Sequence, residues 1–195
     1  MRIDIISVLP EIMESPLSHS IIQRAKQKNL VEINLVGLRD FGIGNYKQVD
    51  DYPYGGGGGM VLRAEPLATC IESLYTQHTY DDVIYLTPDG YLLNQKIANQ
   101  LSIKQNLLLI CGHYKGIDQR IRDKYVTLEI SIGDYVLSGG ELAACVLTDT
   151  LIRLIPGVLG DEMSALSDSF QDGLLAPPVY TRPEVWDGRS VPEVL

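Results

Sequence analysis

Several kinds of segment are missing from this chain of 195 residues, and each absence narrows its class. No apolar run reaches the roughly 18 residues that a membrane-crossing helix requires. The opening MRIDIISVLPEIME has an apolar patch but no small-residue cleavage site, which favours a first strand over a signal peptide. Cysteine is scarce, and Cys70, Cys111 and Cys145 form no CxxC pair, so neither a zinc site nor a disulfide framework is indicated. We expect buried free thiols in a reducing cytoplasm.

Common nucleotide-binding and hydrolase motifs are also absent. No GxxxxGK[ST] occurs, which excludes a P-loop NTPase, and no GxGxxG lies between the first expected strand and helix, which disfavours the ordinary dinucleotide fold. His19, His78 and His113 are scattered, so no Ser–His–Asp arrangement can be recognised by spacing. No ligand cluster with metal spacing is visible. Of the three histidines, only His113 lies in a glycine-rich loop.

Positive charge is in deficit, because the formal net charge is −9. Phosphate binding requires lysine and arginine, so this balance alone favours a small-molecule enzyme over a nucleic-acid enzyme. A local basic patch can nevertheless coexist with an acidic total. The chain is 45% hydrophobic and 21% charged, which suits one packed domain, or one domain with part of a second.

Short apolar strands alternate with helical segments along the chain. This order predicts an α/β fold with a mainly parallel sheet flanked by helices. We expect strands over 2–9, 31–38, 83–86, 106–111 and 126–132, and helices over 10–28, 64–77, 94–103, 116–124 and 141–155. The last helix is predicted to be strongly amphipathic, Asn94 is a candidate N-cap, and 87–90 is a predicted turn. The five-glycine run 55–59 fits either a flexible linker or an ordered surface loop.

The domain organisation follows from composition. Residues 1–156 form the expected α/β domain, and the polar, acid-bearing residues 157–173 are interpreted as a flexible linker. Residues 174–195 are rich in proline and have too little apolar periodicity to fold alone, so we interpret them as the start of a second domain.

Three glycine-bearing loops follow expected strands. They are LTPDG at 86–90, CGHYKGID at 111–118 and SIGDYVLSGGE at 131–141. In α/β sheets, ligands bind beyond the carboxyl ends of the strands, and glycine lets the backbone approach a ligand closely. A single such loop is usually only a turn, but three at one sheet edge together indicate a site that could enclose an adenosine.

The strings that carry these loops closely resemble the bacterial tRNA (guanine-N1)-methyltransferase family, TrmD, of the SPOUT superfamily. The similarity runs from residue 1 to 195 and includes VDDYPYGGGGGM at 49–60, LLLICGHYKGIDQRI at 107–121, SIGDYVLSGGELAA at 131–144, RLIPGVLG at 153–160 and DSFQDGLLAPPVYTRPEV at 168–185. The order of SIGDYVLSGGE and IPGVLG is highly specific. The resemblance implies a parallel α/β domain with a C-terminal trefoil knot, which general topology rules would have rejected.

The resemblance also implies the activity, which is transfer of a methyl group from S-adenosylmethionine to N1 of guanine 37, just 3′ of the anticodon of tRNA. The family acts as a cytoplasmic homodimer without membrane contact, and its modification helps to maintain the reading frame. Magnesium is possible, and residues 174–195 would begin a truncated C-terminal tRNA-binding domain. By similarity, the residues around the cofactor are Tyr85, Leu86, Thr87, Gly112, Tyr114, Gly116, Ile132, Gly133, Tyr135, Leu137, Gly139 and Gly140.

Two catalytic residues follow from the same resemblance. Asp168 matches the family's general base, which removes the N1 proton of guanine and comes from the partner chain. Arg153 matches the arginine that stabilises negative charge on O6. Without the resemblance, Asp168 would be read as a solvated linker acid and Arg153 as a helix arginine with its charge in solvent.

The chain departs from the family pattern at His113 and Lys115, where many members carry arginine and glutamate. If that glutamate normally faces the amino group of the cofactor, Glu141 or Asp134 is the candidate to replace it. Two alternatives stay open at this point. One is a ribose or other rRNA methyltransferase of the same superfamily, against which the segment around Asp168 argues, and the other is a non-catalytic cofactor- or RNA-binding module.

Overall fold

A parallel sheet forms the centre of the protein. The structure, a computed structural model, describes residues 1–159, 169–170 and 174–194. Its central sheet has five strands in the order β2-β1-β6-β5-β7, and all four pairings between them are parallel. The α/β class with a mainly parallel sheet is therefore confirmed. The strands are β1 (Arg2–Ser7), β2 (Glu32–Gly37), β5 (Asp82–Leu92), β6 (Asn106–Cys111) and β7 (Leu128–Ser131).

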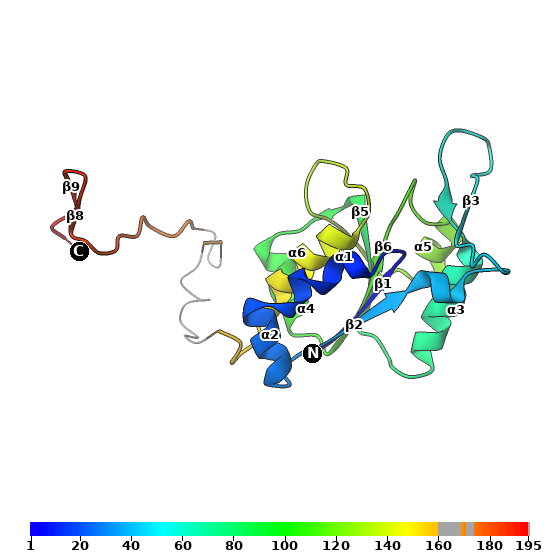
Figure 1. Cartoon of the computed structure of the whole chain (residues 1–195), viewed down its shortest axis with the longest axis horizontal. Coiled ribbons are helices and arrows are strands. Elements are labelled where there is room, and N and C mark those ends of the chain that lie inside the picture. The colour runs from blue at the N-terminus through cyan, green and yellow to red at the C-terminus, as the bar shows by residue number, and fades with distance from the viewer. Residues whose placement is uncertain (160–168, 171–173, 195) are drawn as a thin grey trace.

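Helices cover both faces of this sheet (Figure 1). One face is covered by α1 (Glu11–Glu14), α2 (Ser20–Gln27), α4 (Gln95–Ser102) and α6 (Glu141–Ile152). The other face is covered by α3 (Ala64–Tyr75) and α5 (Gln119–Tyr125). Two short 3-10 helices, η1 (Pro16–Ser18) and η2 (Leu38–Phe41), complete the helical segments of this domain.

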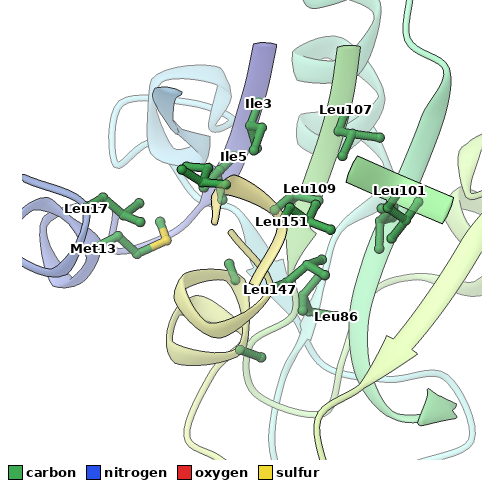
Figure 2. Packing of buried hydrophobic residues seen from close by; sticks show 14 of the residues in the cluster. Ile3, Ile5, Met13, Leu17, Leu86, Leu101, Leu107, Leu109, Leu147 and Leu151 are labelled. Atoms are coloured by element: carbon green, nitrogen blue, oxygen red, sulfur yellow. The ribbon is translucent and has the colours of Figure 1, made fainter. Parts of the chain in front are cut away.

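The apolar core explains why the strands lack polar alternation. In β6, Leu107 and Leu109 pack toward α6, whereas Leu108 and Ile110 pack toward α3 and α5. Figure 2 shows the apolar cluster on the side of the sheet that α6 covers, where residues of β1 and β6 meet Leu147 of α6. Because both faces of the strands are covered, residues of both alternating sets must be apolar.

Helix ends follow the local chemistry of the chain. Asn94 caps α4 as predicted, since its side chain accepts a hydrogen bond from the N–H of Ile97 at 3.0 Å. The helix predicted over 10–28 is wrong as a single element and is divided into α1, η1 and α2. Pro16 has no N–H to donate, so the chain after Glu14 cannot continue the α-helical ladder. The helix predicted from 116 begins at Gln119, where Asp118 caps the N–H of Arg120.

Helix α6 is less amphipathic than predicted. It ends at Ile152, and its inward side chains are buried against the sheet and the neighbouring helices. Two of its outward residues, Leu142 and Val146, are also apolar, with exposed fractions of 50% and 45%. The outer face of this helix is therefore an exposed apolar surface.

The turn predicted at 87–90 does not end the strand. Strand β5 continues to Leu92, and both Leu86 and Tyr91 pair with Ile130 of β7. The four residues between them bulge out of the ladder, and we call Thr87–Gly90 the β5 bulge. At Gly90 an added Cβ would lie 2.6 Å from the backbone of Glu129, so glycine permits this close approach.

The five-glycine run belongs to an ordered hairpin rather than a linker. Strands β3 (Asp50–Asp51) and β4 (Val61–Leu62) pair antiparallel on either side of it. The hairpin is also tied to the loop after β6, because Lys115 N–H donates to the carbonyl of Met60 at 2.9 Å and Leu62 N–H donates to the carbonyl of Gly116 at 3.0 Å.

The described C-terminal residues carry one further hairpin, formed by β8 (Val185–Trp186) and β9 (Arg189–Ser190). Its side chains are exposed. Most of the predicted linker 157–173 lies outside the described residues, and Asp168 is among those. Within the described part of the chain, no helix is both long and apolar enough to span a bilayer.

Candidate cofactor site

Three loops meet around one cavity at the carboxyl edge of the sheet. They are the β5 bulge, the loop after β6 and the loop after β7, and the cavity that they line has a volume of about 620 Å³. Because the strands are parallel, their carboxyl ends lie at one edge and bring loops distant in sequence together. The cavity is lined by all twelve residues expected around the cofactor: Tyr85, Leu86, Thr87, Gly112, Tyr114, Gly116, Ile132, Gly133, Tyr135, Leu137, Gly139 and Gly140.

Backbone contacts hold the second and third loops together. Gly140 N–H donates to the carbonyl of Gly112 at 2.8 Å, and His113 and Gly139 form an antiparallel bridge. An added Cβ on Gly140 would lie 2.8 Å from Cα of Cys111, so no side chain fits there without moving the backbone. The two loops therefore approach as closely as glycine allows.

Tyr85 connects the first loop to the second. Its side chain is buried, and an added Cβ on Gly112 would lie 2.9 Å from its hydroxyl oxygen. An added Cβ on Gly116 would lie 3.1 Å from the same oxygen. Burial raises the pKa of the Tyr85 hydroxyl, and so this group is a neutral part of the cavity wall.

Few charged side chains of the described residues line the cavity. They are Asp89, Lys115 and Arg122. The hydrogen bond from Thr87 and then the contact with Arg122 lower the pKa of Asp89, which keeps this carboxylate ionised. The cavity thus combines glycine-rich loops and apolar side chains with a few charged groups, as ligand sites commonly do.

Neither acid considered as a replacement at position 115 lines the cavity. Glu141 is buried and accepts a hydrogen bond from the hydroxyl of Ser7 at 2.6 Å, which joins the start of α6 to the end of β1. Asp134 is exposed and lies outside the lining residues. Among the described residues, the carboxylate that lines the cavity is Asp89.

The structure describes only one of the two predicted catalytic residues. Arg153 is the C-cap of α6, and its N–H donates to the carbonyl of Asp149 at 3.2 Å. Asp168 lies outside the described residues, so the structure gives no distance between the two. No group of three or more His, Cys, Asp or Glu side chains that could hold a metal ion occurs in the described ranges.

Sequence reasoning missed Arg122 as part of the site, and it included Asp89 only as a member of the loop 86–90, with no role of its own. Both line the cavity, and the Nη2 of Arg122 lies 2.9 Å from Oδ2 of Asp89. One feature of the sequence could have pointed to Arg122. It is a charged residue in a short predicted helix, and its neighbours Ile121 and Tyr125 in that helix belong to the core.

Comparisons with known proteins match this architecture. The profile of the tRNA (guanine-1)-methyltransferase family, TrmD, matches residues 1–195. A tRNA (guanine-N(1)-)-methyltransferase of Christiangramia forsetii is 63% identical over all of this chain and 86% of its own length. One of Bacteroides thetaiotaomicron is 57% identical over all of this chain and 87% of its own length.

A solved structure agrees with the sequence comparisons. The crystal structure of tRNA (m1G37) methyltransferase from Aquifex aeolicus superposes with a TM-score of 0.83 and 38% identity, covering 99% of this chain and 81% of that one. The match to the family profile spans residues 1–195 and so includes the three cavity loops. The chain therefore belongs to the tRNA (guanine-1)-methyltransferase family, TrmD.

Proposed function

We propose that this chain transfers the methyl group of S-adenosylmethionine to N1 of guanine 37 of tRNA, the guanine 3′ of the anticodon. The observation that carries the proposal is the cavity of about 620 Å³ at the meeting point of the three loops. Its size falls within the range of ordinary small-molecule sites, roughly 300–1,000 Å³. Relatives that bear the corresponding name share the whole length of the chain.

The residues present suit a bent nucleoside cofactor. The Tyr85 ring at Gly112 and the backbone of Cys111 at Gly140 leave no room for side chains at these two glycines, so a ligand there can approach the backbone. S-adenosylmethionine supplies an electrophilic methyl group on a sulfonium centre. We propose that Tyr85, Leu137 and the other ten lining residues predicted above bind it, chiefly through the backbone.

The chemical step requires a base, because N1 of guanine carries a proton. In our proposal Asp168 accepts that proton while the N1 lone pair forms the new bond to the methyl carbon. The electrons of the broken sulfur–carbon bond stay on sulfur, which becomes a neutral thioether. The Arg153 guanidinium stabilises the negative charge that develops on O6 of guanine. Both residues are assigned from the family resemblance.

We further propose a homodimer in which the partner subunit's Asp168 acts at the cavity of the first subunit. The exposed apolar residues Leu142 and Val146 on α6 support an interface, since exposed apolar patches commonly mark association surfaces. The trefoil knot stays a prediction, supported by the contacts that tie 112–113 to 139–140. The substrate places the reaction in the cytoplasm, and no magnesium site is proposed for the described residues.

A methyl-transfer assay tests the proposal. The protein is incubated with labelled S-adenosylmethionine and tRNA transcripts that carry guanine or adenine at position 37. We expect incorporation into the guanine transcript alone, and a loss of about 100-fold or more for Asp168→Asn, the range typical of general-base removal. Asp161→Asn in the same segment is the matched control and should retain activity. Equal transfer to both transcripts, or full activity of Asp168→Asn, would contradict the proposal.

A further inference from the structure

We propose that Arg122 is a positioning residue of the cofactor site, which fixes the β5 bulge in the shape that the ligand requires. The inference deepens the proposed function and rests on it. Leu86 and Tyr91 share one partner, Ile130, so the ladder between β5 and β7 gives Thr87–Gly90 no register of its own. The same bulge supplies Thr87, Pro88 and Asp89 to the cavity wall.

Arg122 ties this bulge to the sheet from outside the ladder. Its Nη2 donates to Oδ2 of Asp89 in the bulge at 2.9 Å and to Oε2 of Glu129 in β7 at 2.7 Å. Its Nε donates to Oε1 of Glu129 at 2.8 Å, which completes a two-point pair with that carboxylate. Asp89 is held from its other side by the hydroxyl of Thr87. One guanidinium thus links the β5 bulge to β7, the strand with which the bulge residues do not pair.

Arg122 also contacts the first and second loops through Tyr85. The guanidinium carbon lies 5.2 Å from the centroid of the Tyr85 ring, within the range of a cation–π contact. The hydroxyl of the same ring closes against Gly112 and Gly116. The side chain of Arg122 is only 19% exposed, so its bonds to Glu129 are partly shielded from solvent, whereas its bond to Asp89 lies at the surface. A displacement of Arg122 is therefore transmitted to two of the three loops.

Removing the guanidinium has a specific consequence. Asp89 and Glu129 both contact the same nitrogen, and without it two carboxylates face each other across the base of the bulge. Their repulsion displaces Asp89, which is 62% exposed where Glu129 is 30% exposed, and with it Thr87 and Pro88. The effect falls on cofactor binding, because the chemical step is assigned to other residues.

Calorimetric titration with S-adenosylhomocysteine tests this inference. We expect Arg122→Met to bind about ten-fold more weakly than the unchanged protein, the loss expected for charged hydrogen bonds. Arg122→Lys should be intermediate, since lysine keeps the charge but not the two-point geometry. In methyl transfer, KM for S-adenosylmethionine should rise while kcat stays within about two-fold.

A double variant separates positioning from simple support of the fold. Asp89→Asn in the Arg122→Met background removes the repulsion and should recover part of the lost affinity, which a loss of packing would not permit. Lys124→Met is the matched control, because Lys124 lies on the same helix and pairs with Glu72 instead of the bulge. If Arg122→Met does not fold, Asp89→Asn alone tests the tie and should weaken binding about three-fold.

Unchanged affinity of Arg122→Met for S-adenosylhomocysteine would overturn the inference. If that variant does not fold, unchanged affinity of Asp89→Asn would overturn it. An equal loss of affinity in Lys124→Met would overturn it as well. Failure of the unchanged protein to bind S-adenosylhomocysteine contradicts the proposed function instead, so the two failures are distinguishable.

Discussion

At the scale of single residues, the cavity is built by the absence of side chains. Gly112 and Gly140 let two loops touch through their backbones, and the N–H of Gly140 donates to the carbonyl of Gly112 at 2.8 Å. A side chain at Gly140 would meet the backbone of Cys111, which cannot move without shifting β6. The loop positions are therefore set by steric fit as well as by hydrogen bonds.

Gly140→Ala tests this steric limit. The added Cβ would lie 2.8 Å from Cα of Cys111, so one loop must move and the site must open. We expect binding of S-adenosylhomocysteine to weaken by about ten-fold or more. Gly58→Ala is the control, because an added Cβ there has no heavy atom within 4 Å, and its affinity should be unchanged. Equal affinity of both variants would show that the contact at Gly140 is not limiting.

The site residues that could be predicted from the sequence have a signal in their local sequence, whereas the missed ones do not. Glycines after apolar strands marked the three loops locally, and the twelve residues that the family resemblance assigned to the cofactor line the cavity. Arg122, Asp89 and Glu129 come from three different elements, and only the folded sheet brings their charges together. Glu141 was a candidate to replace the glutamate that many family members carry at position 115, but it is buried and accepts a hydrogen bond from the hydroxyl of Ser7.

At the scale of elements, pairing between strands overrides local turn chemistry. Thr87-Pro88-Asp89-Gly90 has the composition of a turn, yet the chain returns to β7 and pairs through Leu92. The pairing depends on residues more than 35 positions away in sequence, as the Tyr91–Ile130 register shows. The apolar run predicted that a strand lies here. The bulge could not be predicted, because it depends on how β5 pairs with the neighbouring strand β7.

The outer face of α6 leads to a prediction about assembly. Leu142 and Val146 lie one turn apart and are about half exposed. If this face joins two subunits, Leu142→Glu with Val146→Glu should convert a dimer to a monomer, because two buried carboxylates would lack partners. Light scattering coupled to size-exclusion chromatography measures the mass. Ile103→Glu, at an exposed apolar residue after α4, should stay dimeric. A monomeric unchanged protein would contradict the proposed homodimer.

At the scale of the whole molecule, parallel topology explains why one edge carries the site. Every central strand ends at the same edge, so segments near residues 87, 113 and 138 converge although they are far apart in sequence. The α/β class followed from the alternation of apolar strands and helices. The knot did not, because no local pattern records which loop a chain passes through.

The opposite edge of the sheet offers a contrast. A second cavity, of about 560 Å³, lies there beside Met1, Arg2, Glu32 and Gln105. No glycine is among the described residues that line it. Size alone does not separate the two cavities, so the assignment depends on the loops.

Amide hydrogen exchange with and without S-adenosylhomocysteine tests the central claim most directly, because it reports which backbone segments the ligand protects. The account predicts slower exchange in 85–89, 112–117 and 131–140, with little change in 29–33 and 104–106 at the other edge of the sheet. Protection confined to that other edge, or no protection at a saturating ligand concentration, would contradict it.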